Sequence, residues 1–154
     1  MNQSKKKQKN IWTKKYITKE IFLNTNLHIQ AINYLKNQNY IDYKIIKEIL
    51  QINYNKYYPI GYVVKIKNKI VGFVGTLLSK RKINNKNYLY CNIHTWVVDK
   101  HHRVASHLLY KPLIKKKYII TVLSPQNRLI KIFKKMGFQP VENELQNYSF
   151  KFYF

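Results

Sequence analysis

The stretch SPQNRLIKIFKKMGF, residues 124–138, has the pattern of one complete helix and constrains the fold more than any other part of the chain. Ser124 can accept a backbone N–H as the N-cap, and Pro125 suits the first helical position, where no N–H is needed. Gly137 can end the helix, because glycine tolerates the left-handed conformation of a C-terminal cap. A β-branched run precedes this helix and a short apolar run follows it. The sequence therefore predicts a strand–helix–strand unit.

The length and composition of the chain indicate a single domain. Its 154 residues suffice for one substantial core, and we expect a disordered basic tail over residues 1–10 and one domain over residues 11–154. Cys91 is the only cysteine, which excludes an internal disulfide and a zinc site built from several cysteines. No apolar run approaches the length of about 20 residues that spans a bilayer, and the start lacks a secretory signal. These features predict a cytoplasmic location.

The net charge of +23 is the most unusual property of the composition. Genome bias toward lysine explains part of it, but not the shortage of acids, since 29 lysines and arginines stand against six aspartates and glutamates. A positive field of this size attracts nucleic acid, an anionic membrane surface, an acidic protein or a polyanionic substrate. The alternative interpretation is that the charge only keeps a protein of biased composition soluble.

The order of elements predicted along the chain is that of a mixed α and β fold. Hydrophobic periodicity predicts a strand over residues 12–23 and helices over 27–37 and 42–51, the second of which Asp42 can cap. It also predicts strands over 62–67, 70–79 and 88–98, with a tight hairpin at 68–69 and a polar loop at 81–87. A polar turn at residue 99 then leads into a helix that Pro112 is expected to interrupt. A strand over 118–123, the helix at 124–137 and two closing strands, at 138–141 and 148–154, complete the prediction.

The helix that begins after Asp99 offers an anion site. Its first backbone N–H groups are free of intrahelical partners, and Lys100 and Arg103 lie beside them. Backbone dipole and side-chain charge therefore favour a phosphate group at this position.

This order of elements, together with two motifs, resembles the GNAT superfamily of acyl-CoA N-acyltransferases. The run Lys100-His101-His102-Arg103-Val104-Ala105, followed by Leu108-Leu109, occupies the spacing of the loop that holds the pyrophosphate of acetyl-CoA in that family, although Lys100 and Arg103 replace its usual residues. Asn127 and the Gly137-Phe138 pair match the family's closing helix. The resemblance implies an α+β fold with a mixed, mostly antiparallel sheet of six to seven strands and about four helices.

The resemblance also implies acetyl-CoA or another acyl-CoA as co-substrate, with no metal. The residues it assigns to acyl-CoA binding are Trp96, Val97, Val98, Lys100, Arg103, Val104, Ala105, Ser106 and Asn127. The tyrosine that usually serves as general acid in the family is replaced by Phe133, so Ser124 or a nearby tyrosine is the candidate for that role.

The resemblance makes His94 the candidate general base, because serotonin acetyltransferase-like members of the family carry a histidine of their proton relay at this place in the fourth strand. The usual pKa of histidine suits a group that must remove a proton from an amine near neutral pH. Strand alternation predicts that Asn92 and Trp96 share its face, which makes Asn92 a candidate for substrate binding. A histidine hydrogen-bonded within the sheet is the alternative. Cys91 is more typical of a packed strand cysteine than of a nucleophile. His101, His102 and His107 form a weak metal signal and are better explained as phosphate contacts or solvated side chains.

The sequence therefore predicts an acyltransferase that moves an acetyl or longer acyl group from acyl-CoA to an amine or hydroxyl acceptor. The alternative is a non-enzymatic nucleic-acid-binding protein, since basic grooves with aromatic side chains bind single strands and the chain has 14 tyrosines. A third possibility joins the two: an enzyme whose acceptor is RNA, an anionic glycan or a lipid, or whose donor is carried by an acidic acyl-carrier protein. Exposed tyrosines continuous with a lysine stripe would favour nucleic acid.

Overall fold

The computed structural model describes residues 16–38, 41–51, 56–123 and 125–140. The chain divides into two compact units, residues 1–123 and 124–154. The first unit contains β1 (Tyr16–Ile21), α2 (Asn26–Lys36), α3 (Tyr43–Gln51), β2 (Gly61–Ile66), β3 (Lys69–Ile83), β4 (Lys86–Val98), the 3₁₀-helix η1 (Lys100–Ala105), α4 (Ser106–Lys115) and β5 (Ile119–Val122). The second contains α5 (Asn127–Lys135).

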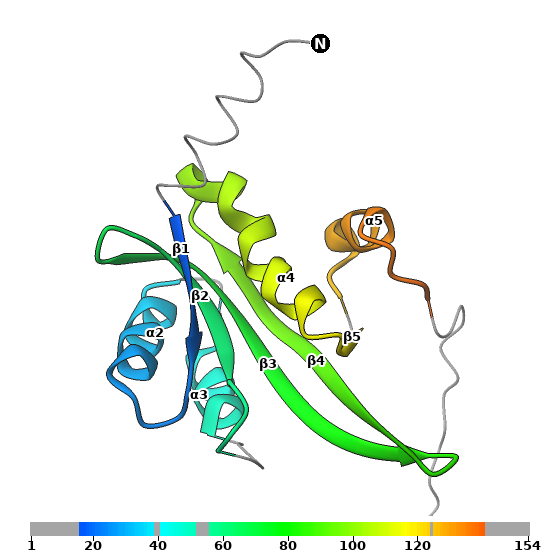
Figure 1. The fold of residues 1–154 in the computed structure, drawn as a ribbon. Coiled ribbons are helices and arrows are strands. Elements are labelled where there is room, and N and C mark those ends of the chain that lie inside the picture. Colours follow the sequence, from blue (N-terminus) through cyan, green and yellow to red (C-terminus); the bar gives the residue numbers. More distant parts are fainter. Residues whose placement is uncertain (1–15, 39–40, 52–55, 124, 141–154) are drawn as a thin grey trace, which may run out of the picture. The chain divides into compact units, whose positions relative to one another are not determined.

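The five strands form one sheet in the order β1-β2-β3-β4-β5 (Figure 1). Neighbouring strands are antiparallel from β1 to β4, whereas β5 runs parallel to β4. The predicted α+β class, the mostly antiparallel sheet and the four α-helices are thus confirmed for the described residues. Within the described residues the sheet has five strands, fewer than the six to seven predicted. Residues 138–140 form no strand, and the predicted strand at 148–154 lies outside the described residues.

The sheet carries helices on both faces, and alternate strand residues serve the two sides. Val63, Phe73 and Val97 belong to a buried apolar cluster with residues of α2 and α3. The opposite face packs on α4, where Leu109 lies against the position of Gly72. One face of the sheet therefore packs on α2 and α3, and the other packs on α4. None of the helices in the described ranges has the length and apolar character needed to span a bilayer.

The connection between β3 and β4 is not the polar loop that the sequence predicted. Both strands continue through most of residues 81–87, and only Asn84 and Asn85 form the turn, with φ values of 48° and 60°. Two consecutive left-handed residues are typical of the two-residue turns that match strand twist, and asparagine tolerates this conformation. The result is a two-stranded ribbon, residues 79–89, that we call the arm.

The N-terminal helices follow their predicted patterns. Thr25 caps α2 by accepting the backbone N–H of His28, and the Asp42 carboxylate accepts that of Lys44 at 3.0 Å. The predicted capping role of Asp42 is therefore confirmed.

The second unit confirms the C-terminal end of the predicted helix. Gly137 has φ of +91°, and its N–H donates to the Lys134 carbonyl while the N–H of Phe138 donates to that of Phe133. The two phenylalanine rings meet at 5.1 Å. These bonds and this contact form a Schellman motif, which explains the Gly-Phe pair. The helix begins at Asn127, because Gln126 has a non-helical backbone with φ of −58° and ψ of 139°. Pro125 therefore lies before the helix and not at its first position as predicted, and Ser124 lies outside the described residues.

Helix α4 continues through Pro112 to Lys115, although the sequence predicted an interruption there. Proline has no N–H, so the carbonyl of Leu108 one turn earlier loses its helical donor. The hydroxyl of Thr18 on β1 donates to this carbonyl at 3.3 Å. A side chain from the neighbouring strand thus replaces the missing bond and keeps the helix intact.

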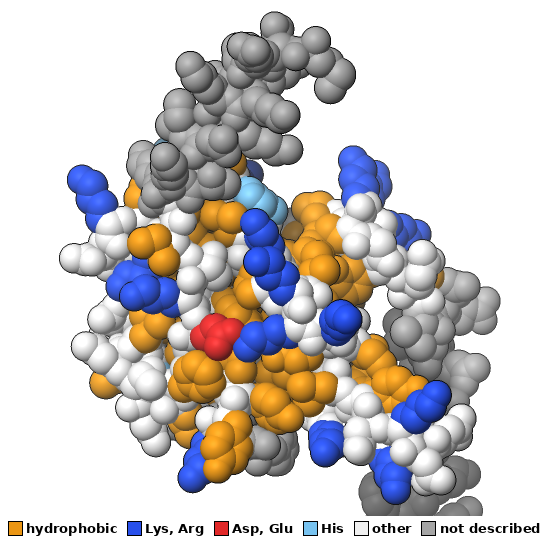
Figure 2. Space-filling model, viewed as in Figure 1, with side chains coloured by type: hydrophobic (Ala, Val, Ile, Leu, Met, Phe, Trp, Pro, Cys, Tyr) orange, Lys and Arg blue, Asp and Glu red, His pale blue; other side chains and the backbone are white. Residues whose placement is uncertain are grey.

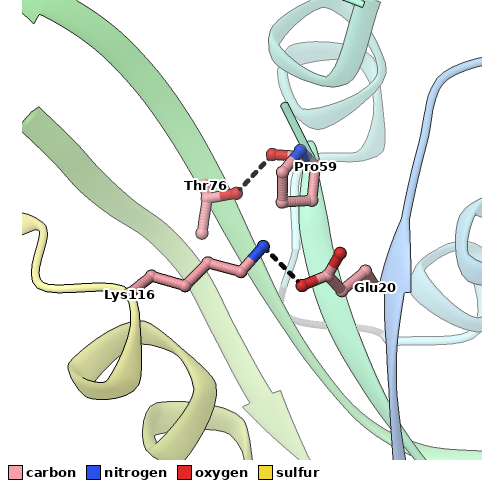
Figure 3. A network of polar contacts seen from close by, with 4 residues as sticks. All are labelled: Glu20, Pro59, Thr76 and Lys116. Atoms are coloured by element: carbon pink, nitrogen blue, oxygen red, sulfur yellow. Dashed lines mark hydrogen bonds and ion pairs between the residues drawn. The ribbon is translucent and has the colours of Figure 1, made fainter. Parts of the chain in front are cut away.

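Strand β1 holds the whole η1–α4 segment through its alternate residues. Tyr16 bonds to His102 in η1 at 3.0 Å, and Thr18 bonds to the first turn of α4. Glu20 pairs with Lys116, just after the end of α4, at 2.6 Å. Figure 3 shows this ion pair beside the bond from the Thr76 hydroxyl to the Pro59 carbonyl. Contacts along its length therefore set the position of η1 against the sheet.

Candidate functional site

A β-bulge interrupts β4 at the centre of the sheet. Gly75 pairs with His94 and Phe73 with Val97, so two residues of β4, Thr95 and Trp96, stand opposite one residue of β3. Thr95 has φ of 48°, a conformation that a β-branched side chain rarely adopts. Bulges of this kind bend a strand and redirect its side chains, and they often occur beside active sites.

His94 lies flat on the backbone of β3. A Cβ atom added to Gly75 would overlap the imidazole ring, with Nδ1 at only 2.6 Å, so the ring needs glycine at that position. The Nδ1 atom of His94 is 3.1 Å from the hydroxyl of Thr95. Burial lowers the pKa of His94 to about 4, because the charged imidazolium would lose its hydration. His94 is therefore a neutral imidazole at pH 7.

The bulge places Trp96 on the opposite face from His94, which corrects the predicted shared face. Gly75 and Phe73 lie on the α2/α3 side, and His94 pairs with Gly75 on that side. The ring of Trp96 stacks on Tyr110 of α4, with 6.2 Å between centroids. The extra residue at the bulge shifts the alternation by one, so the prediction from regular alternation fails here. Burial raises the pKa of Tyr110, whose phenol stays protonated.

The pairing of β5 with β4 ends just before the bulge. The last pair is Ile93 with Val122, and one residue earlier the Thr121 hydroxyl donates to Oδ1 of Asn92 at 3.3 Å. Within residues 94–98 of β4, His94, Val97 and Val98 pair with β3 on one edge, and none of the five pairs with β5 on the other. Asn92 shares the face of His94 as predicted, but its side-chain oxygen is already engaged.

The strand leads directly into η1. Asp99 fixes this junction: its N–H donates to the Val71 carbonyl at 2.9 Å, and its carboxylate accepts the hydroxyl of Tyr34 at 2.8 Å. Lys100 and Arg103 are exposed beyond it. The predicted anion site thus consists of two exposed cations on a short helix whose start is bonded to strand β3 through Val71 and to helix α2 through Tyr34.

The other residues assigned to acyl-CoA binding differ in exposure. Val97 and Ala105 are buried, Val98 and Ser106 are half-buried, and Val104 is exposed. A residue whose side chain is buried in the core can contact acyl-CoA only through its backbone groups. Asn127 is the first residue of α5 and belongs to the second unit. Ser124 lies outside the described residues, so its role stays a prediction.

The histidines near η1 have structural partners. His102 bonds to Tyr16, and Nδ1 of His107 lies 2.7 Å from the Val104 carbonyl. His101 is exposed. No group of three or more metal-ligating side chains occurs in the part of the chain that the structure describes. Cys91 is fully buried, and burial raises the pKa of its thiol to about 12, which suits a packed strand residue.

Gly75 and Thr95 are the residues of this site that sequence reasoning missed. A glycine inside a strand pattern is itself a signal of close backbone approach, and the ring of His94 is what approaches. Nothing in the sequence marks Thr95, because threonine is an ordinary strand residue. The bulge arises from the register between β3 and β4, which is a tertiary property.

Comparisons with known proteins support the fold. No protein-family model and no curated protein matches this sequence. Solved structures do: an aminoglycoside acetyltransferase from an uncultured soil metagenomic sample superposes with a TM-score of 0.55 and 15% identity, covering 90% of this chain and 99% of that one. A possible acetyltransferase from Clostridium difficile 630 superposes with a TM-score of 0.54 and 15% identity, covering 89% of this chain and 99% of that one.

A second aminoglycoside acetyltransferase from uncultured soil, solved in complex with sisomicin, has a TM-score of 0.52 and 16% identity, and covers 92% of this chain and 99% of that one. This chain therefore has the fold of the GNAT acetyltransferases, as its motifs predicted.

Proposed function

We propose that this protein is an acyltransferase that transfers an acetyl or longer acyl group from acyl-CoA to an amine or hydroxyl acceptor. The observation that carries the proposal is the edge of β4 that β5, its described neighbour, leaves after Ile93. Five residues, 94–98, have left the pairing with β5 and lead to the anchored start of η1, with Lys100 and Arg103 exposed beside it. An extended chain with amide groups can pair with such a strand edge, and a diphosphate can bind the adjacent cations.

The acyl-CoA molecule has these two features in one chain. Its pantetheine chain carries two amides. The diphosphate would lie near Arg103, and the pantetheine chain would follow β4 toward the bulge. The thioester carbonyl would then lie near His94 and Thr95. Backbone N–H groups exposed by a bulge are suited to stabilise the oxyanion that forms during acyl transfer.

The proposed chemistry is direct transfer. The acceptor nitrogen or oxygen forms a bond to the thioester carbon, the carbon–sulfur bond breaks, and the proton lost by the acceptor passes by way of the imidazole to the departing thiolate. The pKa of His94 is about 4, so the imidazole is already neutral and able to accept a proton across the physiological range. Such a weak base would act mainly as a proton relay. It would also accept a hydrogen bond from the amine or hydroxyl of the substrate and so orient it.

The charge of the chain bears on the acceptor. Three of the described acids are already engaged: Glu20 pairs with Lys116, Asp99 accepts from Tyr34, and Asp42 caps α3. In Figure 2, lysine and arginine side chains are distributed over the face in view, and acidic side chains are scarce. A polycationic acceptor would be repelled by this field, so an acceptor that is anionic, or is carried on an anionic molecule, fits better.

Calorimetric titration of CoA into the wild type and Arg103→Glu tests the proposal. We expect the reversal to weaken binding about tenfold or more, because it replaces a charge-assisted phosphate contact with repulsion. Lys115→Glu is the matched control: it makes the same charge change on an exposed lysine at the far end of α4 and should alter affinity by less than about threefold. Equal affinities for wild type and Arg103→Glu would overturn the site.

A further inference from the structure

The arm, residues 79–89, lies apart from the core of the sheet (Figure 1). The pairing of β2 with β3 ends at Gly75, and β5 pairs with β4 only from Tyr90 onward. Among the described strands, those of the arm pair only with each other, and residues 79–88 are all exposed. A two-stranded ribbon of this kind is at best marginally stable alone. Because its side chains are exposed, packing in a core does not explain which residues occur there.

The exposed side chains of the arm are strongly basic. Lys80, Arg81, Lys82 and Lys86 lie within it, and no carboxylate does. Like charges close together on a ribbon are destabilising, and the arm contains no acid that could offset them. Because these charged side chains are exposed and cost stability, they indicate a function for the charge.

The two faces of the arm have different chemistry. Cross-strand pairing places Arg81 opposite Tyr88, and the Arg81 guanidinium lies over the ring of Tyr90 at 5.1 Å. Alternation puts Lys80 and Lys82 on the other face. One face thus combines a cation with aromatic rings, and the other is a pair of lysines.

We propose that the arm binds single-stranded nucleic acid. The lysines and Arg81 would contact backbone phosphates, and the exposed ring of Tyr88 would stack on a base, which is the combination that binds single strands with little sequence preference. An anionic membrane would need a larger apolar surface than Ile83, the large aliphatic side chain exposed near the turn. The arm is on the strand that carries His94, about 20 Å from it along six residues of β4.

Fluorescence anisotropy with the full chain and a labelled oligouridylate, without acyl-CoA, tests the arm. Lys80→Gln with Lys82→Gln should weaken binding about tenfold and reduce the slope of log K against log salt by about 1.4, because two phosphate contacts are lost. Lys44→Gln with Lys47→Gln removes the same charge from exposed positions of α3 and should change neither quantity appreciably.

Tyr88→Ala separates stacking from charge. It should weaken binding about tenfold while leaving the salt slope unchanged, since a stacking contact releases no counterions. Far-UV circular dichroism should be unaltered in all variants, because the substituted side chains are exposed. Equal losses in the arm and α3 variants, or tighter binding to duplex RNA or to anionic phosphatidylserine vesicles, would overturn the proposal. Arg103→Glu should leave nucleic-acid binding within about threefold of wild type, so this test and the CoA test can fail independently.

Discussion

The two ends of β4 differ in almost every physical property, although they belong to one continuous strand. Around the bulge, His94 is held by Gly75 and Thr95, and Trp96 by Tyr110. In the arm, residues 79–88 are exposed and four of them are cationic. Packing fixes side chains in single positions, which acyl transfer requires, whereas exposed charge attracts a polyanion without fixing its register. Under the two proposals made above, β4 would combine precise chemistry at the bulge with loose attachment of a polyanion at the arm.

Backbone conformation separates the same two regions. Thr95 and Asn85 both have left-handed φ values, 48° and 60°. Asparagine accepts that conformation at little cost, but a β-branched threonine is strained by it, typically by about 1–3 kcal/mol. Strain is thus concentrated at the bulge and is small in the arm.

The largest effect is expected from breaking the contact beneath His94. Gly75→Ala places a methyl group where the imidazole ring lies, so the ring must leave its position. We expect a loss of about 1–3 kcal/mol in the free energy of unfolding, from overpacking, and a rise of the His94 pKa from about 4 toward 6.5 as the ring becomes hydrated. Urea unfolding and an NMR titration of the imidazole protons measure both, and neither needs a known acceptor.

Gly72→Ala provides the matched control on the same strand. Its added Cβ would lie 3.2 Å from Val98, which requires only a small shift, so His94 should keep its pKa. In a His94→Ala background, Gly75→Ala should lose most of its cost because the clash is gone. An unchanged His94 pKa in Gly75→Ala would contradict the proposed seating of the ring.

The second prediction concerns how the stability of the fold depends on pH. The pKa of His94 is about 4 in the folded protein and about 6.5 when unfolded, so between these values the unfolded chain binds a proton that the folded chain does not. The contribution of His94 to stability is therefore present above pH 6.5 and is lost as the pH falls toward 4, by up to about 3 kcal/mol. Urea unfolding at pH 7 and pH 4.5 should show a larger decrease for wild type than for His94→Gln.

His28 contributes in the same direction, because burial also lowers its pKa, and it should account for part of the decrease that remains in the variant. The arm has no histidine, so its nucleic-acid binding should not follow this titration. Identical pH dependence in wild type and His94→Gln would show that the imidazole has an ordinary pKa in the fold.

Sequence patterns predicted what depends on local physics. The Gly137 cap, the Asp42 cap and the order of strands and helices in the described residues follow from residue types and periodicity. The motif around Arg103 located the segment that leads from β4 into the helix. Local patterns could not predict the bulge, which depends on strand register, or the rescue of Pro112 by Thr18, which depends on a contact between distant segments. The arm was missed because its residues are polar, and polarity was interpreted as a loop.

The smallest expected effects compare the two left-handed positions directly. Thr95→Gly should relieve strain and raise the free energy of unfolding by up to about 1 kcal/mol, partly offset by the greater freedom of glycine in the unfolded chain. It also removes the hydroxyl that lies 3.1 Å from Nδ1 of His94, so the ring should become less ordered by NMR. Asn85→Gly should change stability by only a few tenths of a kcal/mol, because asparagine already tolerates the turn. If both substitutions stabilised the protein equally, the strain would not be specific to the bulge, and the contrast between the two ends of β4 would rest on burial and charge alone.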